Sequence, residues 1–271
     1  MNRGILAKTL RECAVAYAVA FLGVMIFEVG FVRAMGEFSA DISRVWLENR
    51  TIRRMVQMLV GYDLARDLTP TTLMAIGLAH PLLFGLCWSP LIAAATRAFA
   101  GEIDRGTADL LLTLPVSRVT VYLGSSAVFL ALAAPLCLAP PIGIALGQSW
   151  FPLWGPIAID RLWRPALNLY ALTLAIGGIA TLISAVCVRR GVAVGAVLAV
   201  VLASMLILFL SSFWKLPAPI LRACLFHYYQ PLPLIRSNGW PIGDVLVLLG
   251  VALVAWSAGL AWFVRRDIPA A

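Results

Sequence analysis

Hydrophobic residues fill long, nearly uncharged stretches of this chain, and short segments between them hold most of the polar side chains. The stretches cover residues 14–32, 73–95, 119–147, 166–188, 192–213 and 243–264. Each has roughly the 20 residues that an α-helix needs to cross a hydrocarbon layer of about 30 Å. They are continuously apolar and do not alternate, which argues against the strands of a membrane barrel. The pattern predicts an all-α polytopic membrane protein with six transmembrane helices in one domain, residues 1–271.

Composition supports lipid as the main solvent of the chain. It is 62% hydrophobic and 13% charged, with a mean hydropathy of +0.93, which is far from the composition of a soluble domain. The first stretch is longer than the core of a signal peptide, so we expect it to be retained as a span. No run of five basic residues occurs, so no nucleic-acid partner is expected. The five cysteines and two histidines show no metal-ligand spacing, and no metal site is predicted.

The distribution of basic residues predicts the orientation in the membrane. With the N-terminus in the cytoplasm, the inner segments are 1–13, 96–118, 189–191 and 265–271. They hold ten of the 21 lysines and arginines in about half the length of the outer segments. The first outer loop opposes this bias because it is also arginine-rich, although long loops constrain topology less. We expect an N-in, C-in arrangement.

Two outer segments have structure of their own. The first outer loop contains an amphipathic stretch, Val45 to Leu68. Before the last span, Lys215 to Ile242 holds five prolines around a short apolar run, Ile220 to Tyr229. This run is too short to cross the membrane, so we predict a re-entrant or interfacial pair of short helices, whose irregular backbone must be covered by protein.

Motifs for catalysis are missing from the sequence. Neither lysine, Lys8 or Lys215, follows the glycines of a Walker A loop, so the chain alone is not expected to hydrolyse ATP. The sequence also contains no His-Glu-x-x-His and no Gly-x-Ser-x-Gly. We therefore do not expect an enzyme, and we expect no cofactor bound by this chain.

The inner loop between the second and third spans is the most informative segment. Apolar residues recur at helical spacing on one side, while Glu102, Arg105 and Asp109 share the other, so the segment is amphipathic. Thr107 is placed to cap a second short helix, which Pro115 ends. Periodicity alone leaves two interpretations open, a helix that stiffens the loop and a helix that docks on a partner.

This loop resembles that of the permease subunits of ABC-2 type exporters, which reads Glu-x-x-x-Gly-Thr-x-x-x-Leu-Leu-x-x-Pro-[Val/Ile]-Ser-Arg. The matching residues are Glu102, Gly106, Thr107, Leu110, Leu111, Pro115, Val116, Ser117 and Arg118. The six-span layout and the apolar segment before the last span are also similar. The chain departs from the family in its N-terminal segment, where Lys8-Thr9 replaces a basic residue followed by glutamate and Glu12 is the nearest acid.

The resemblance implies a multi-pass permease of the bacterial plasma membrane. Its inner loop would be a coupling helix, formed by Thr107 to Leu114, that docks on a separate ATP-binding subunit expected in two copies. ATP and Mg²⁺ would bind to that partner. A second permease copy or paralogue would complete the path, with membrane lipid around it.

Two further polar residues are candidates for the translocation path. Glu28 lies about one turn from the outer end of the first span, where an acid is a functional candidate but can also reach the interface toward Arg33. His227 lies beside two tyrosines in the outer apolar run, where a packing role is the alternative. The rival functions are a stand-alone secondary carrier or channel, and a membrane-integral enzyme. The sequence does not specify the transported substrate.

Overall fold

The computed structural model describes residues 3–37, 48–60, 69–107, 116–211, 213–237 and 239–266. Within these ranges every regular element is helical. Six helices are long and apolar enough to cross a membrane: α1 (Arg3–Glu37), α5 (Pro81–Ala98), α8 (Arg118–Trp150), α9 (Ile159–Val186), α10 (Arg190–Ser211) and α13 (Ile242–Arg265). The predicted all-α polytopic fold is confirmed.

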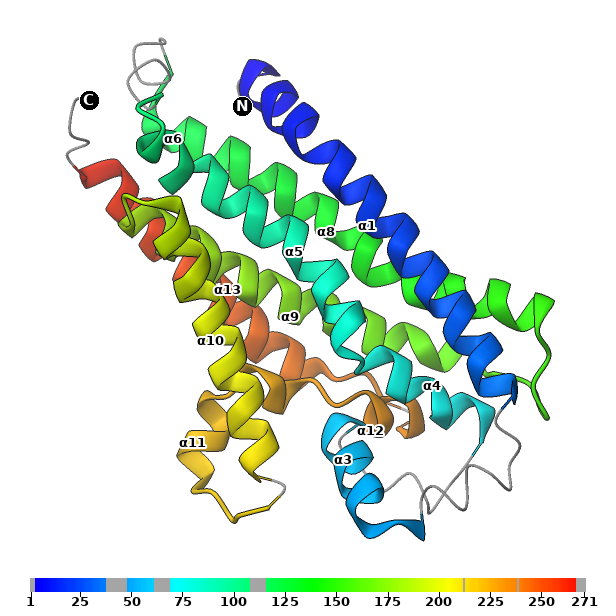
Figure 1. Cartoon of the computed structure of the whole chain (residues 1–271). Helices are drawn as coiled ribbons and strands as arrows, with labels where there is room; N and C mark the ends of the chain where they lie inside the picture. Colours follow the sequence, from blue (N-terminus) through cyan, green and yellow to red (C-terminus); the bar gives the residue numbers. More distant parts are fainter. Residues whose placement is uncertain are drawn as a thin grey trace.

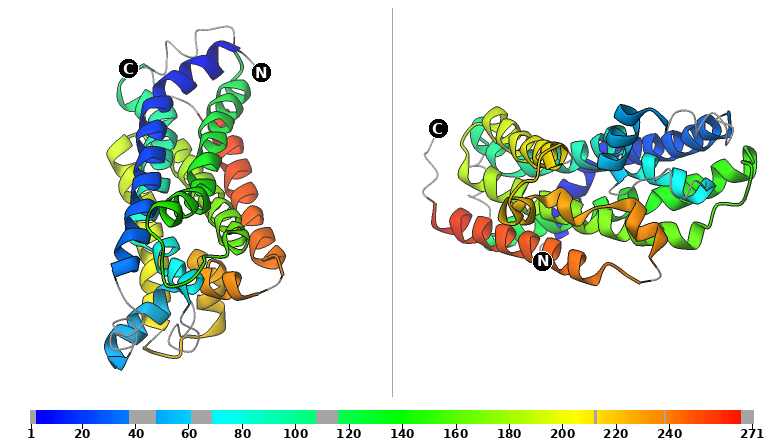
Figure 2. Two further views of the ribbon diagram at one scale, coloured as in Figure 1. Left: turned by 90° about the vertical axis from the view of Figure 1, so that its right-hand side faces the viewer. Right: turned by 90° about the horizontal axis from the view of Figure 1, so that it is seen from below.

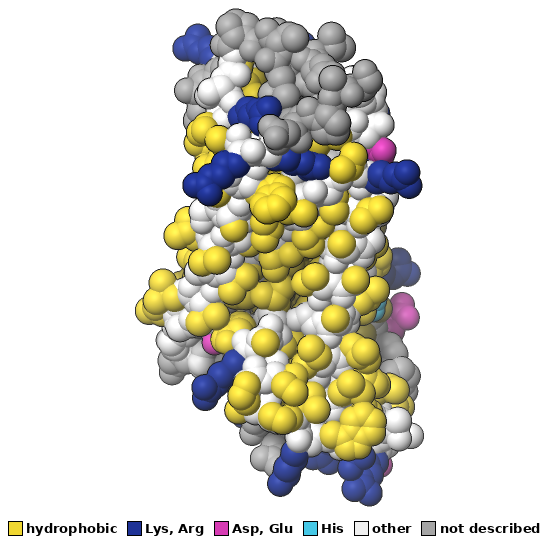
Figure 3. All heavy atoms as spheres, turned by 90° about the vertical axis from the view of Figure 1, so that its left-hand side faces the viewer, with side chains coloured by type: hydrophobic (Ala, Val, Ile, Leu, Met, Phe, Trp, Pro, Cys, Tyr) yellow, Lys and Arg dark blue, Asp and Glu magenta, His cyan; other side chains and the backbone are white. Residues whose placement is uncertain are grey.

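The six long helices form one elongated bundle, in which α9 packs against α5, α8, α10 and α13 (Figure 1). Helix α1 lies along α8 on the other side of the bundle. The start of α1 and the end of α13 lie at the same end of the molecule, as an even number of spans requires (Figures 1 and 2). On the face drawn in Figure 3, hydrophobic side chains cover the middle of the molecule, and lysines and arginines gather toward both ends.

Glycines allow α9 and α13 to approach closely. A Cβ added to Gly178 would lie 2.6 Å from the carbonyl oxygen of Ala252, and one added to Gly259 would lie 2.9 Å from the Cα of Leu182. Both contacts are with backbone atoms, which cannot move aside as a side-chain end can. Small residues at such positions are the usual means by which membrane helices pack, since no hydrophobic effect drives them together in lipid.

The second predicted span, residues 73–95, is wrong as a single helix. The structure divides it into α4 (Pro70–Leu78) and α5, with a break at Ala79 and His80. Proline disfavours the helical conformation of the residue before it, and His80 is extended, with ψ 134°. The His80 imidazole then caps α5 by accepting a hydrogen bond from Leu82 N at 3.2 Å.

Helix α1 begins well before the predicted span, at Arg3 and not near residue 14. Its 35 residues correspond to about 52 Å at 1.5 Å per residue, which exceeds the hydrocarbon thickness of about 30 Å. The first turns run at an angle to the rest of α1, across the end of the bundle (Figure 2). They rest on α8, where Ile5 lies against Gly124.

The segment before the last span consists of α11 (Ala218–Ala223), the 3-10 helix η2 (Leu225–Tyr228) and α12 (Pro231–Arg236). The Phe226 ring lies 5.5 Å from that of Trp88 on α5. Side chains of two spans hydrogen-bond to the irregular backbone of this segment. Ser204 Oγ of α10 accepts from Leu225 N at 2.8 Å, and Asn168 Nδ2 of α9 donates to Tyr228 O at 2.7 Å. The prediction of short helices covered by protein is confirmed for η2 and α12, but the segment has three short helices and not two, and α11 contains no buried residue.

The amphipathic stretch predicted in the first outer loop contains α3 (Arg50–Val60), which contacts α4 and α12. Asn49 caps it, since its side-chain oxygen accepts from Thr51 N at 3.0 Å. Residues 45–47 and 61–68 of that stretch lie outside the described residues.

Candidate functional site

A short helix, α6 (Ala100–Asp104), follows α5 at the end of the bundle that holds both termini. It ends in a Schellman turn, in which Gly106 N donates to Ile103 O and Thr107 N donates to Glu102 O, each at 3.0 Å. Gly106 has φ 66°, a conformation that glycine adopts without steric cost. The four-residue spacing between Glu102 and Gly106 is therefore the spacing of a helix end.

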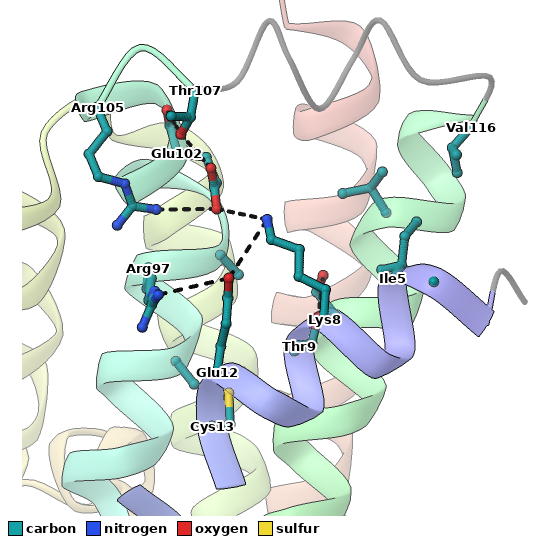
Figure 4. Close-up of a pocket in the computed structure, with 15 residues that line it drawn as sticks. Ile5, Lys8, Thr9, Glu12, Cys13, Arg97, Glu102, Arg105, Thr107 and Val116 are labelled. Atoms are coloured by element: carbon teal, nitrogen blue, oxygen red, sulfur yellow. Dashed lines mark hydrogen bonds and ion pairs between the residues drawn. The ribbon is translucent and has the colours of Figure 1, made fainter. Parts of the chain in front are cut away.

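Glu102 is buried, although the sequence placed it on the polar side of an amphipathic helix with Arg105. Its side chain is 11% exposed, against 44% for Arg105. Lys8 Nζ of α1 donates to Glu102 Oε1 at 3.1 Å, and Arg105 Nη2 lies 3.2 Å from the same oxygen. The Thr107 hydroxyl donates to the second oxygen, Oε2. Figure 4 shows these side chains converging on one carboxylate from two distant parts of the chain.

These contacts determine the ionisation of Glu102. Burial by itself raises the pKa of a carboxyl group, but the hydrogen bonds from Thr107 and Lys8, and the charges of Lys8 and Arg105, outweigh it. The pKa of Glu102 therefore lies below its ordinary value of 4.5. The carboxylate is therefore charged throughout the neutral range.

A second carboxylate extends this group into what we call the Lys8 cluster, made of Lys8, Glu12, Arg97, Glu102 and Arg105. Glu12 Oε1 lies 3.9 Å from Lys8 Nζ and 3.8 Å from Arg97 Nη2. Lys8 thus stands between two acids, one on its own helix and one on α6 (Figure 4).

The Lys8 cluster borders a partly open cavity of about 520 Å³ between α1, α5, α6 and α8. Thr9 and Ser125 join α1 and α8 across it, with 3.4 Å between their hydroxyl oxygens. Cys13, Ala94 and Val121 contribute apolar surface to its wall. The cavity therefore combines a charged group with an apolar lining.

Helix α6 is also fixed to the two helices on its other side. Ala100 N donates to Ser184 Oγ of α9 at 3.0 Å, and Arg190 N of α10 donates to Asp104 Oδ2 at 3.3 Å. Together with the Lys8–Glu102 pair, these contacts connect α6 to three spans.

The remaining predicted loop residues divide into two groups. Ser117 caps α8, since its hydroxyl accepts from Thr120 N at 3.2 Å. Arg118 donates to the carbonyl of Arg266 at the end of α13. Asp109, Leu110, Leu111 and Pro115 lie outside the described residues, and so does most of the helix predicted from Thr107 to Leu114.

Glu28 is wholly buried within the span part of α1, and it does not reach toward Arg33. Gly143 of α8 makes room for it, because a Cβ added there would lie 2.8 Å from Glu28 Cβ. Neither carboxylate oxygen has a hydrogen-bond partner among the described residues. Arg33 instead lies 3.9 Å from Glu37 and over the Phe151 ring.

His227 belongs to η2, away from the Lys8 cluster and from the residues around Glu28. Its ring packs edge-on against Tyr228, with 5.2 Å between centroids. The structure therefore does not bring the candidate path residues Glu28 and His227 into one site with the inner loop. In the part of the chain that is described, no group of three or more His, Cys, Asp or Glu side chains could hold a metal ion.

The sequence pattern did not indicate the roles of Lys8 and Arg97: Arg97 entered only the count of inner basic residues, and Lys8 that count, the Walker A search and the family comparison. The available signal was the i,i+4 spacing of Lys8 and Glu12, which places opposite charges on one face of a helix. Nothing local in sequence pairs Lys8 with Glu102, which lies 94 positions later.

Comparison with known proteins gives one family. Residues 7–264 match the family described as "Multidrug efflux system permease Rv1217c, C-terminal domain". The match reaches into all six spans and includes the Lys8 cluster. No curated protein matches the chain.

Proposed function

Since this chain belongs to the family of the multidrug efflux system permease Rv1217c, C-terminal domain, we propose that it is the transmembrane permease subunit of an ABC-2 type exporter. In this proposal the bundle forms part of the translocation path. The inner loop couples it to a separate subunit that binds and hydrolyses ATP with Mg²⁺. The family name supports a transporter permease, and the loop motif from Glu102 to Arg118 supports the ABC-2 type.

The observation that carries the proposal is the anchoring of α6. A coupling element must move together with the spans as a rigid body when its cytoplasmic partner moves. Helix α6 enters the loop through a rigid Schellman turn and is bonded to α1 through Lys8, to α9 through Ser184 and to α10 through Arg190. On the far side of the loop, Ser117 caps α8. The loop thus begins and ends on fixed elements, as rigid-body coupling requires.

The proposed assembly has two permease copies, or this chain and a paralogue, with two ATP-binding subunits in a bacterial plasma membrane. The N-in, C-in orientation puts α6 and both termini on the cytoplasmic side. It follows from the positive-inside rule, with Arg97, Arg105 and Arg190 among the basic residues at that end.

Purification of the tagged full chain from the membranes of its own organism, in mild detergent, tests the proposal. We expect an ATP-binding subunit to co-purify. Reversing the charge in the loop, Asp109→Lys, should abolish co-purification. The matched control is Asp160→Lys, the same change at an exposed acid in the first turn of α9 at the opposite end. An intact chain that recruits no ATP-binding subunit would contradict the proposal.

Glu28 favours a second candidate, a stand-alone secondary carrier. An ionisable side chain buried in a span without a partner is costly, and such residues often mark ion or substrate pathways. If the chain works alone, proteoliposomes that contain only this chain should take up its substrate when a pH gradient is applied. Glu28→Gln should abolish this uptake. If the exporter proposal holds, the chain alone should show no such uptake before or after the change.

A further inference from the structure

The cavity beside the Lys8 cluster has an excess of positive charge. Its lining includes three cations, Lys8, Arg97 and Arg105, and two carboxylates, Glu12 and Glu102. With all five groups ionised the cavity carries one net positive charge. A ligand with a single negative charge would neutralise it.

Arg97 is the least satisfied of these cations. Its Nε is buried and has no hydrogen-bond partner among the described residues, and its Nη2 reaches Glu12 Oε1 only at 3.8 Å. That distance is longer than a hydrogen bond between a guanidinium and a carboxylate. The buried Nε cannot reach a ligand, but Nη2 makes no close hydrogen bond to Glu12 and is available to an anionic oxygen.

Charged and apolar residues share the lining of the cavity. Cys13 on α1 and Ala94 on α5 lie farther into the bundle than Lys8 and Arg97, respectively, since the two helices run in opposite directions. The cavity thus offers cations beside apolar surface, as the phosphate and the acyl chain of a phospholipid require.

We propose that this cavity binds one anionic phospholipid of the adjacent leaflet. Its phosphate lies among Lys8, Arg97 and Arg105, and part of an acyl chain lies along Cys13, Ala94 and Val121. The volume of about 520 Å³ falls in the range of roughly 300–1,000 Å³ typical of small-molecule sites. Basic pockets between spans on the cytoplasmic side are suited to anionic head groups. The site does not depend on an ATP-binding partner.

The test is a lipid titration of the full chain, delipidated in detergent and read by native mass spectrometry. Phosphatidylglycerol should occupy one tight site, and phosphatidylcholine should not. Arg97→Gln should weaken phosphatidylglycerol binding roughly fivefold, the effect of one basic side chain near an anionic head group. The matched control is Arg11→Gln, which removes the same charge from an exposed residue of α1 outside the cavity lining. It should weaken binding by less than about twofold.

Arg97→Lys keeps the charge and should retain most of the binding, which separates loss of the site from loss of folding. Should Arg97→Gln fail to fold, Arg105→Gln reports on the same phosphate position. Equal effects of Arg97→Gln and Arg11→Gln would reduce the interaction to general surface attraction and overturn the proposal. Equal binding of the two lipids would also overturn it, and so would complete displacement of phosphatidylglycerol by inorganic phosphate.

Discussion

Lys8 Nζ lies 3.1 Å from Glu102 Oε1, which joins the first turns of the chain to the start of the loop between the second and third spans. The carboxylate is buried and the ammonium is half-exposed, so the pair connects the inside of the bundle to its surface. Around this pair, α6 is held against three spans. The pair thus connects the N-terminal segment of α1 to α6.

A double-mutant cycle measures the strength of this pair. We expect Glu102→Gln to cost about 1–3 kcal/mol of unfolding free energy, because a buried carboxylate loses charge-assisted hydrogen bonds. Lys8→Met should cost less, since its side chain is 45% exposed. The coupling energy should be about 0.5–1 kcal/mol after solvent screening. Thermal unfolding in detergent gives all four values, and a coupling near zero would show that the two side chains act independently.

The contribution of Glu102 to the stability of the folded chain should be lost at acidic pH. Because its pKa is lower in the folded chain, the contribution is present above the ordinary value of 4.5 and is lost as the pH falls through the folded pKa. The difference in melting temperature between wild type and Glu102→Gln should stay constant from about pH 8 to pH 5 and shrink below about pH 4. A difference that already shrinks between pH 8 and 6 would contradict the lowered pKa.

Substitution of Gly106 should destabilise the folded chain because this residue has a positive φ. Gly106→Ala should cost about 1–2 kcal/mol, and Gly106→Asn less, since asparagine tolerates this conformation. Gly191→Ala is the control, because an added Cβ meets nothing within 4 Å at that helical position. Melting temperatures of the three variants test this, and equal effects at Gly106 and Gly191 would argue against the Schellman turn.

The close contact between α9 and α13 should also be destabilised by a single added methyl group. Gly178→Ala places a Cβ 2.6 Å from a backbone oxygen and should cost about 1–3 kcal/mol through overpacking. Gly250→Ala, on α13, meets nothing within 4 Å and should be neutral or slightly stabilising. Unfolding of both variants in detergent gives the comparison, and a harmless Gly178→Ala would mean that the two helices are farther apart.

Hydrophobic periodicity predicted the six spans because span length and apolarity are local properties. It missed the division at His80, where one proline interrupts an otherwise apolar run. It also placed the start of α1 too late, because the first turns are polar enough to lie outside the lipid. The burial of Glu102 was not predictable from local pattern, since it depends on Lys8, 94 residues away.

The most direct test of the proposed function is ATP hydrolysis by the complex of this chain with its ATP-binding subunit in proteoliposomes. Wild-type chain should give steady hydrolysis, Asp109→Lys should reduce it to the background of empty vesicles, and Asp160→Lys should leave it unchanged. Hydrolysis that is absent with wild-type chain, or equal with Asp109→Lys, would contradict coupling through this loop.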